Sequence, residues 1–373
     1  MQSAEEKGTT NRLRGVLDAL LVPVLAIITA LIVGGLIIWA VGGNAIAAYK
    51  ALVQGAFGSP RALSETAVWS TPYIFAGLAV AFAFKGGLFN IGAEGQLALG
   101  AVAAALIGYA LPVWLGIQLS PFIHIPLAVG MGILAGAIWA AIPGALKAYT
   151  GAHEVINTIM MNYIALNITS FLLNGPMKDP DPLNVVARTP PIALSARIPP
   201  IFPHLRVHWG FVLALLVAVF VWWILQKTTL GREIRTVGAN PDAAKYAGIN
   251  VKRMIIVTMA ISGALAGLAG AIEVTALNYR HELGFSIGYG FDAIAIALLG
   301  KSNPFGVVLA AILFGAMRNG ATRMQFVTQI PVDIISVIQA LILLFVAADA
   351  IVRYIYRIRA PQDRVVLTRG WGG

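Results

Sequence analysis

Three polar side chains, Asn90, Glu94 and Gln96, stand close together in a glycine-rich run between two long apolar segments (GGLFNIGAEGQ, residues 86–96). A carboxylate at membrane depth is costly and usually marks a functional position. Clustered glycines let the backbone bend or approach a neighbour closely. Because irregular backbone in a membrane must be buried or line a wet cavity, this run predicts a broken or re-entrant element on a polar substrate path.

Other polar and aromatic residues at membrane depth extend this candidate path. Asn157 lies near one helical face of its segment, and the aromatic rings of Phe89 and Tyr289 offer surfaces for stacking. A short echo links Gly86–Asn90 (GGLFN) with Gly288–Asp292 (GYGFD), as expected for the inverted repeats of transporters. The alternative is that each polar residue only joins helices. The candidate pathway residues are Phe89, Asn90, Glu94, Gln96, Asn157, Tyr289 and Asp292.

The sequence gives little support to the common enzyme classes. It has no cysteine and no HExxH pattern. Gly300-Lys301-Ser302 resembles the end of a phosphate-binding loop, but the pattern requires glycine at the position of Ala295. We therefore expect no catalytic residue, no metal site and no cofactor, and any ATP hydrolysis that drives the protein would occur on another chain.

The composition indicates an all-α polytopic membrane protein. Of the 373 residues, 58% are hydrophobic and 11% are charged, whereas soluble domains carry roughly 25% charged residues. A span needs about 20 apolar residues, which predicts about ten transmembrane helices. The candidate spans are 20–42, 64–84, 96–115, 123–147, 153–173, 209–226, 253–276, 285–300, 304–322 and 331–352; the short 285–300 and 304–322 segments could instead form a broken pair.

The distribution of positive charge indicates the orientation. The net charge is +10, and most of the 26 Lys and Arg residues fall on one side of the predicted bundle. The positive-inside rule makes that side cytoplasmic, with both termini inside. This charge is therefore better explained by topology than by nucleic-acid binding. The expected organisation is a cytoplasmic segment 1–19, a transmembrane domain 20–352 and a basic cytoplasmic tail 353–373.

Two loops have unusual sequences. The predicted external loop 174–208 is rich in proline, which resists helix, so we expect it to be extended and stiff. It is either a plain connector or a docking surface for an external partner. The cytoplasmic loop 227–252 contains Asn240, Pro241 and Asp242, which suit the cap and first turn of a helix, and Gly248, which suits its end. A helix this short is marginal alone, so we expect it to pack against a cytosolic partner.

Three segments carry a family resemblance: GGLFNIGAEGQLALG (86–100), GREIRTVGANPDAAKYAGINV (231–251) and GYGFDAIAIALLGKSNPFG (288–306). They resemble the permease subunits of bacterial ATP-binding cassette (ABC) importers in the group that serves ribose-type sugars, branched-chain amino acids and nucleosides. The first segment is most similar to the nucleoside (purine) branch. The resemblance covers most of residues 60–350.

The resemblance implies partners and a mechanism. A cytosolic ATPase with tandem nucleotide-binding domains would drive alternating access, a paralogous second permease would complete the pore as a heterodimer, and an extracytoplasmic binding protein or lipoprotein would deliver the substrate. The complex would lie in the cytoplasmic (inner) membrane of a bacterium. The segment around 240–249 would be the coupling helix, and the implied ATPase contacts are Arg232, Arg235, Asn240, Pro241, Asp242, Ala244, Tyr246 and Gly248.

Two alternatives stay open. The substrate could be a simple sugar rather than a nucleoside. The chain could also be an ion-coupled secondary transporter in which Glu94 or Asp292 carries the proton, although that model leaves the docking loop unexplained.

Overall fold

The computed structural model describes residues 2–114, 116–181, 186–286 and 288–357. Within these residues the regular secondary structure is helical, and β-structure is limited to two isolated bridges. The helices are α1 (Gln2–Ala40), α2 (Ala45–Phe57), α3 (Pro60–Lys85), α4 (Ala93–Trp114), α5 (Pro121–Thr150), α6 (Glu154–Asn174), the 3₁₀-helix η1 (Leu194–Ala196), α7 (Trp209–Lys227), α8 (Thr229–Ala239), α9 (Pro241–Tyr246), α10 (Val251–Ile272), the π-helix η2 (Glu273–Asn278), α11 (Tyr289–Leu299), α12 (Pro304–Thr328), α13 (Asp333–Ala347) and α14 (Asp349–Ile355).

The fold confirms an all-α polytopic membrane protein. In the described part of the chain, eight helices are long and apolar enough to cross a bilayer, and each matches a segment expected from hydropathy. The count of about ten is not confirmed, because α11 and α13 have only 11 and 15 residues. At 1.5 Å per residue, α11 is roughly 16 Å long, about half of the hydrocarbon core.

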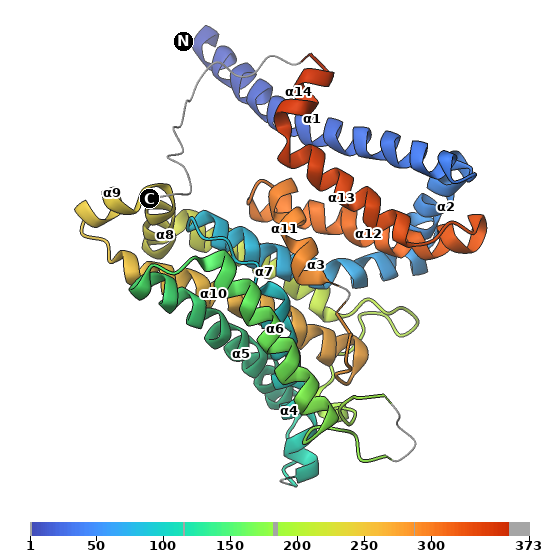
Figure 1. The fold of residues 1–373 in the computed structure, drawn as a ribbon, viewed down its shortest axis with the longest axis vertical. Helices are drawn as coiled ribbons and strands as arrows, with labels where there is room; N and C mark the ends of the chain where they lie inside the picture. The colour runs from blue at the N-terminus through green and yellow to red at the C-terminus, as the bar shows by residue number, and fades with distance from the viewer. Residues whose placement is uncertain (1, 115, 182–185, 287, 358–373) are drawn as a thin grey trace.

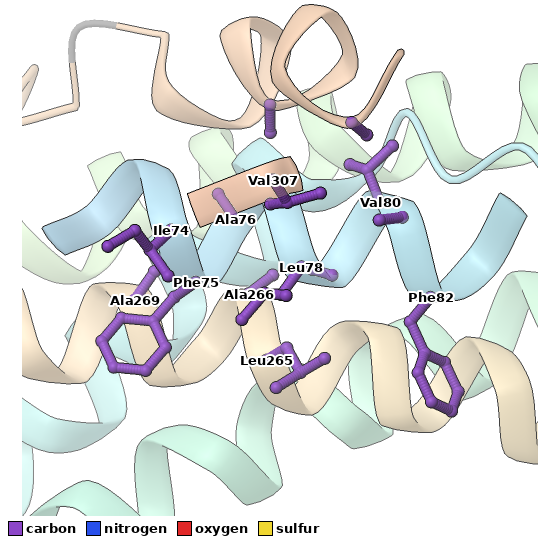
Figure 2. Packing of buried hydrophobic residues seen from close by; sticks show 14 of the residues in the cluster. Ile74, Phe75, Ala76, Leu78, Val80, Phe82, Leu265, Ala266, Ala269 and Val307 are labelled. Atoms are coloured by element: carbon purple, nitrogen blue, oxygen red, sulfur yellow. The ribbon is translucent and has the colours of Figure 1, made fainter. Parts of the chain in front are cut away.

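Helix α3 runs through the centre of the protein. Its residues from Thr71 to Ala83 are all buried, and its apolar side chains are not confined to one face of the helix. Phe75 and Phe82 point toward α10, where Leu265 is among the residues they face, while Val307 of α12 packs on the other side (Figure 2). A helix that is apolar all round is buried all round, so α3 is an internal helix with neighbours on every face.

Glycines allow α4, α5 and α10 to pack with their backbones in contact. A Cβ atom on Gly136 of α5 would lie 2.8 Å from Cα of Gly267 in α10, and Gly100 of α4 meets the same glycine. Gly263 of α10 likewise meets the Gly136 carbonyl. Small residues permit such close approach in a membrane, where dispersion forces hold helices together.

The two unusual loops lie at opposite ends of the long helices. Figure 1 shows α8 and α9 at one end and the segment after α6, which holds the Pro-rich stretch, at the other. Among its described residues this stretch is largely extended, as expected, with η1 as its only helical turn. At the chain ends, α1 is one continuous helix from Gln2, and residues 358–373 of the predicted basic tail lie outside the described residues.

Candidate functional site

The helix break before α4 is held together by two amides. Residues 86–92 are non-helical and lead from the end of α3 to the start of α4, which narrows the predicted broken element to this segment. Asn90 donates to Gln96 Oε1 across 2.9 Å, and Gln96 donates back to Asn90 Oδ1 across 3.0 Å. Asn90 also donates to Ser262 Oγ of α10 at 2.8 Å and accepts from Gly92 N–H at 2.9 Å. Both amides are 1% exposed or less. The hydrogen-bonded pair of Asn90 and Gln96, the amide staple, links the helix break to α10.

A third amide ties the break to α6. Asn162 donates to the Ile91 carbonyl and accepts from the Gly95 N–H, each at 2.8 Å. The hydroxyl of Thr158, one turn earlier, accepts from Ile91 N–H at 3.3 Å. These side chains satisfy backbone groups that the helix break leaves without helical partners, which is the requirement for irregular backbone at membrane depth.

Glu94 joins the starts of two helices. It lies in the first turn of α4, and its Oε2 accepts a hydrogen bond from the backbone N–H of Gly290, in the first turn of α11, across 2.7 Å. Gly290 packs directly on the Glu94 backbone, where a side chain would not fit. Next to it, Tyr73 of α3 donates to Asp292 Oδ2 at 2.8 Å. The second echoing segment, Gly288–Asp292, therefore contacts the first turn of α4, which directly follows the helix break that contains the first segment, Gly86–Asn90.

The remaining predicted pathway residues are dispersed. Phe89 is half-buried against Phe84, with ring centroids 4.7 Å apart. Asn157 is half-buried on α6, where its Nδ2 has no partner among the described residues. Tyr289 packs edge-on against Tyr73 at 5.1 Å and also borders a cavity. The structure thus brings together Asn90 with Gln96, and Glu94 with the start of α11, but it does not gather all seven residues into one pocket.

A cavity of about 220 Å³ lies between α3, η2 and α11. Three aromatic rings line it, from Trp69, Phe285 and Tyr289, together with Glu273 of η2. Arg206 of the Pro-rich stretch also lines it, which places the cavity toward that end of the helices. Trp69 and Phe285 could not be predicted from the sequence, because apolar segments contain many aromatic residues and nothing local distinguishes these two.

The Pro-rich stretch is clamped to the loop that leads into α11. Thr189 N–H donates to the His281 carbonyl at 2.9 Å, and His281 N–H donates to the Thr189 hydroxyl at 3.0 Å. Arg188 lies 3.8 Å from Glu282, and the Ile192 N–H donates to the Tyr279 carbonyl at 2.8 Å. The His281 ring is fully buried, and this burial lowers its pKa to about 3. One side of the cavity is therefore formed by a loop that the Pro-rich stretch holds in place.

At the opposite end, α9 forms as the capping pattern predicted. The Asn240 side chain accepts from the N–H groups of Asp242 and Ala243 at 3.0 Å, and Pro241 occupies the first turn. Ala244 is buried, while Tyr246 is 93% exposed. The helix has only six residues, shorter than expected.

Before α9, the basic segment with Arg232 and Arg235 forms a second helix, α8. This helix was not predicted from the sequence. Gly238 of α8 packs against Gly86 and Gly87, at the start of the helix break; a Cβ atom on Gly87 would lie 2.9 Å from Gly238 Cα. Helix α8, which leads into the exposed α9, therefore contacts the helix break that carries Asn90.

These features define a multi-pass, all-α membrane protein with a buried polar junction, a cavity at one end and two short helices, α8 and α9, at the other. The chain belongs to the family described as branched-chain amino acid transport system / permease component, whose model matches residues 62–347.

Relatives of known name cover nearly the whole chain. The guanosine ABC transporter permease protein NupP of Bacillus subtilis (strain 168) is 43% identical over 342 residues, which are 91% of this chain and 96% of the relative. The nucleoside ABC transporter permease protein NupB of Lactococcus lactis subsp. cremoris is 35% identical over 93% of this chain and 94% of its own length. The glucose ABC transporter permease protein TsgB13 of Haloferax volcanii is 33% identical over 92% and 90%, respectively.

Proposed function

We propose that this chain is the permease subunit of an ABC importer that carries nucleosides across the cytoplasmic membrane of a bacterium. The observation that carries the proposal is the 43% identity to a guanosine ABC permease along 91% of the chain. The second nucleoside permease, at 35% identity over 93% of the chain, points to the same substrate class. The chain would contribute the transport path, with no ATPase site of its own.

A simple sugar is the second candidate substrate. The relative that is 33% identical over 92% of the chain is a glucose permease, so the family fold accommodates hexoses as well. The rings of Trp69, Phe285 and Tyr289 in the lining of the cavity are consistent with stacking of a base. Competition between nucleosides and hexoses for uptake separates the two.

Transport of this kind requires partners. An ATPase would bind the α8–α9 face in the cytoplasm, and a binding protein or lipoprotein would approach the end with the Pro-rich stretch. The exposed Tyr246 and the basic α8 support the first contact, while the stiff extended stretch supports the second. In this orientation both termini would lie in the cytoplasm. A paralogous permease would complete the translocation path as the second half of a heterodimer.

A continuous series of contacts supports a mechanism by alternating access. Motion of α9 and α8 would act on Gly86 and Gly87, which touch Gly238. The break would pass this motion to α10 through Asn90 and to the start of α11 through Glu94. Because α11 carries Tyr289 into the cavity, movement at the cytoplasmic end would reach the substrate side through packed groups.

The experiment that tests the proposal is purification of the tagged chain from its native membrane in mild detergent, followed by mass spectrometry and an ATPase assay. We expect an ATPase subunit and a second permease to co-purify, and nucleoside-loaded binding protein to stimulate ATP hydrolysis in the reconstituted complex. Recovery of the chain without an ATPase, together with uptake that survives ATP depletion but collapses with an uncoupler, would favour a secondary transporter instead. Stimulation by hexoses and not by nucleosides would support the sugar alternative.

A further inference from the structure

We propose that the cavity between α3, η2 and α11 is the first nucleobase-binding subsite of the permease, and that Glu273 selects bases that present an imino N–H group. The inference rests on the proposed nucleoside import and adds to it where the base binds and which bases are preferred. Guanine, hypoxanthine and uracil carry such an N–H on their pairing edge, whereas adenine and cytosine carry a lone pair at the corresponding nitrogen.

The shape and lining of the cavity suit one flat ring system. Its volume of about 220 Å³ is below the roughly 300–1,000 Å³ of pockets that enclose whole drug-sized ligands. The rings of Trp69, Phe285 and Tyr289 come from α3, the loop before α11 and α11 itself. Stacking of a base on an aromatic ring typically contributes about 1–3 kcal/mol and does not depend on which base is bound, so these rings supply affinity without selectivity.

The Tyr289 ring is held in place by its contact with Tyr73. Its ring meets the edge of Tyr73 at a centroid distance of 5.1 Å, with the ring planes 84° apart. Tyr73 is itself fixed by its hydrogen bond to Asp292. A preorganised aromatic wall loses little side-chain entropy when a base binds against it.

Glu273 supplies the selective group. It begins the π-helix η2, a rare geometry that is frequent at functional sites, and its residue is 6% exposed. The neighbouring cation does not neutralise it directly: Arg206 pairs with Glu65 at 2.9 Å, and Glu273 forms no ion pair within 4.0 Å among the described residues. Asn278 lines the same cavity as Glu273.

A carboxylate in this position discriminates between bases by hydrogen-bond polarity. In its ionised form, Glu273 only accepts hydrogen bonds, through two oxygens. The N1–H and amino group of guanine present two parallel donors that match both oxygens, and hypoxanthine and uracil present one imino donor. In adenine and cytosine the ring nitrogen presents a lone pair to the carboxylate, which leaves buried acceptors facing one another, and this arrangement is costly.

The test is uptake by cells that express the complete transporter, with radiolabelled guanosine, inosine and uridine compared with adenosine and cytidine. In the wild type we expect preference for the first three. In Glu273→Gln, the ratio of guanosine to adenosine uptake falls at least about tenfold, because the amide replaces one acceptor by a donor and removes the charge. Permease levels are measured by immunoblot in the same membranes.

The matched control is Glu154→Gln. Glu154 is buried to a similar degree, 5% against 6% exposed, but it pairs with Lys147 at 2.9 Å at the junction of α5 and α6, away from the cavity. Its substitution leaves the guanosine-to-adenosine ratio unchanged, whatever happens to total uptake. Trp69→Leu is the second variant: it lowers uptake of every nucleoside and keeps the wild-type ratio, which separates stacking from hydrogen bonding.

Each outcome tests either the proposed function or the inference about Glu273. If the wild type takes up no nucleoside, the proposed function is wrong. If the wild type takes up nucleosides and Glu273→Gln keeps the same ratio, the Glu273 inference is overturned and the proposed function stands. Should Glu273→Gln fail to accumulate in the membrane, Glu273→Asp, which keeps the charge and both acceptors, must retain the preference for imino N–H bases, and loss of that preference would overturn the inference.

Discussion

The Glu94 carboxylate accepts a hydrogen bond from the backbone N–H of Gly290, 2.7 Å away in space and 196 residues away in the chain. Both residues lie in the first turn of a helix, Glu94 in α4 and Gly290 in α11. The carboxylate therefore acts as a cap from outside α11: it satisfies an N–H group that has no helical partner and places negative charge at the positive end of the helix dipole.

Loss of this cap is expected to weaken the protein. Glu94→Leu leaves the Gly290 N–H buried without a partner, which costs about 1–3 kcal/mol. Glu94→Gln keeps an acceptor and loses the charge, so its cost is smaller. The melting temperature of the purified chain in detergent should fall in the order wild type, Glu94→Gln, Glu94→Leu. Asp333→Asn, at an exposed position in the first turn of α13, is the control and should lower the melting temperature less than Glu94→Leu, because an exposed charge at a helix N-terminus contributes only about 0.3–1 kcal/mol.

The amide staple of Asn90 and Gln96 predicts strong coupling between two substitutions. Asn90→Leu removes four hydrogen bonds at once, two with Gln96 and one each with Ser262 and Gly92, so we expect a loss of at least about 2 kcal/mol of unfolding free energy. Adding Gln96→Leu to that variant should cost much less than Gln96→Leu alone, because the partner is already gone. A double-mutant cycle from denaturant unfolding in detergent measures this difference.

The same experiment separates the staple from a substrate contact. If Asn90 and Gln96 chiefly touch the transported molecule, conservative variants keep the wild-type stability and raise the KM of uptake. If they chiefly hold the helix break, stability falls and the KM of the surviving transporters stays close to that of the wild type. Additive effects in the cycle would contradict the staple.

Much of the fold could be predicted because its signals are local. Apolar length predicts the long helices, the glycines at 86–92 predict the break, and Asn240 with Pro241 predicts the start of α9. The number of spans was harder to predict. Helix α11 begins only at Tyr289 and ends at Leu299, and hydropathy does not distinguish a half-length helix from a full span.

The site could be predicted only in part because its contacts are tertiary. The pairing of Asn90 with Ser262 and of Glu94 with Gly290 joins segments more than 170 residues apart, and no spacing in the sequence encodes it. The cavity draws Trp69, Glu273 and Phe285 from separate elements. The π-helix that aims Glu273 depends on the local hydrogen-bond pattern, which residue types alone do not reveal.

Two glycines of α5 give a matched pair for the packing of α5 on α10. A Cβ on Gly136 would collide with the backbone of Gly263 and Gly267, whereas one on Gly130 meets nothing within 4 Å. We expect Gly136→Val to separate the helices and to abolish the monodisperse peak in size-exclusion chromatography. Gly130→Val, the same substitution in the same helix, should elute as the wild type does. Equal behaviour of both variants would contradict the backbone contact.

Two buried histidines predict a loss of stability in acid. Burial lowers the pKa of His281 to about 3, and burial together with the charge of Arg206 lowers that of His208 to about 4, against an ordinary value of 6.5. Above pH 6.5 both histidines are neutral in the folded chain and in the unfolded chain. Below it the unfolded chain binds protons that the folded chain excludes, so stability falls with pH by up to about 1.4 kcal/mol per unit for each histidine.

The measurement is thermal unfolding in detergent between pH 7.5 and 4.5. His281→Asn should flatten the fall in melting temperature with pH, because one of the two titrating sites is gone. His204→Asn, at an exposed position of the same Pro-rich stretch, should retain the wild-type slope. An unchanged slope in His281→Asn would show that His281 does not contribute to the acid sensitivity.

The exposed face of α9 predicts a variant that uncouples transport without unfolding the chain. Tyr246 is 93% exposed and rests on no core, so Tyr246→Glu should leave the melting temperature unchanged. If α9 docks into the ATPase, the new charge at the centre of that contact should lower nucleoside-stimulated ATP hydrolysis and uptake by at least about tenfold, as is typical of a hot-spot aromatic. Tyr354→Glu on α14, a tyrosine 86% exposed, is the matched control. Normal uptake by Tyr246→Glu in a stably assembled complex would remove α9 from the coupling contact and leave the basic face of α8, with Arg232 and Arg235, as the surface to test.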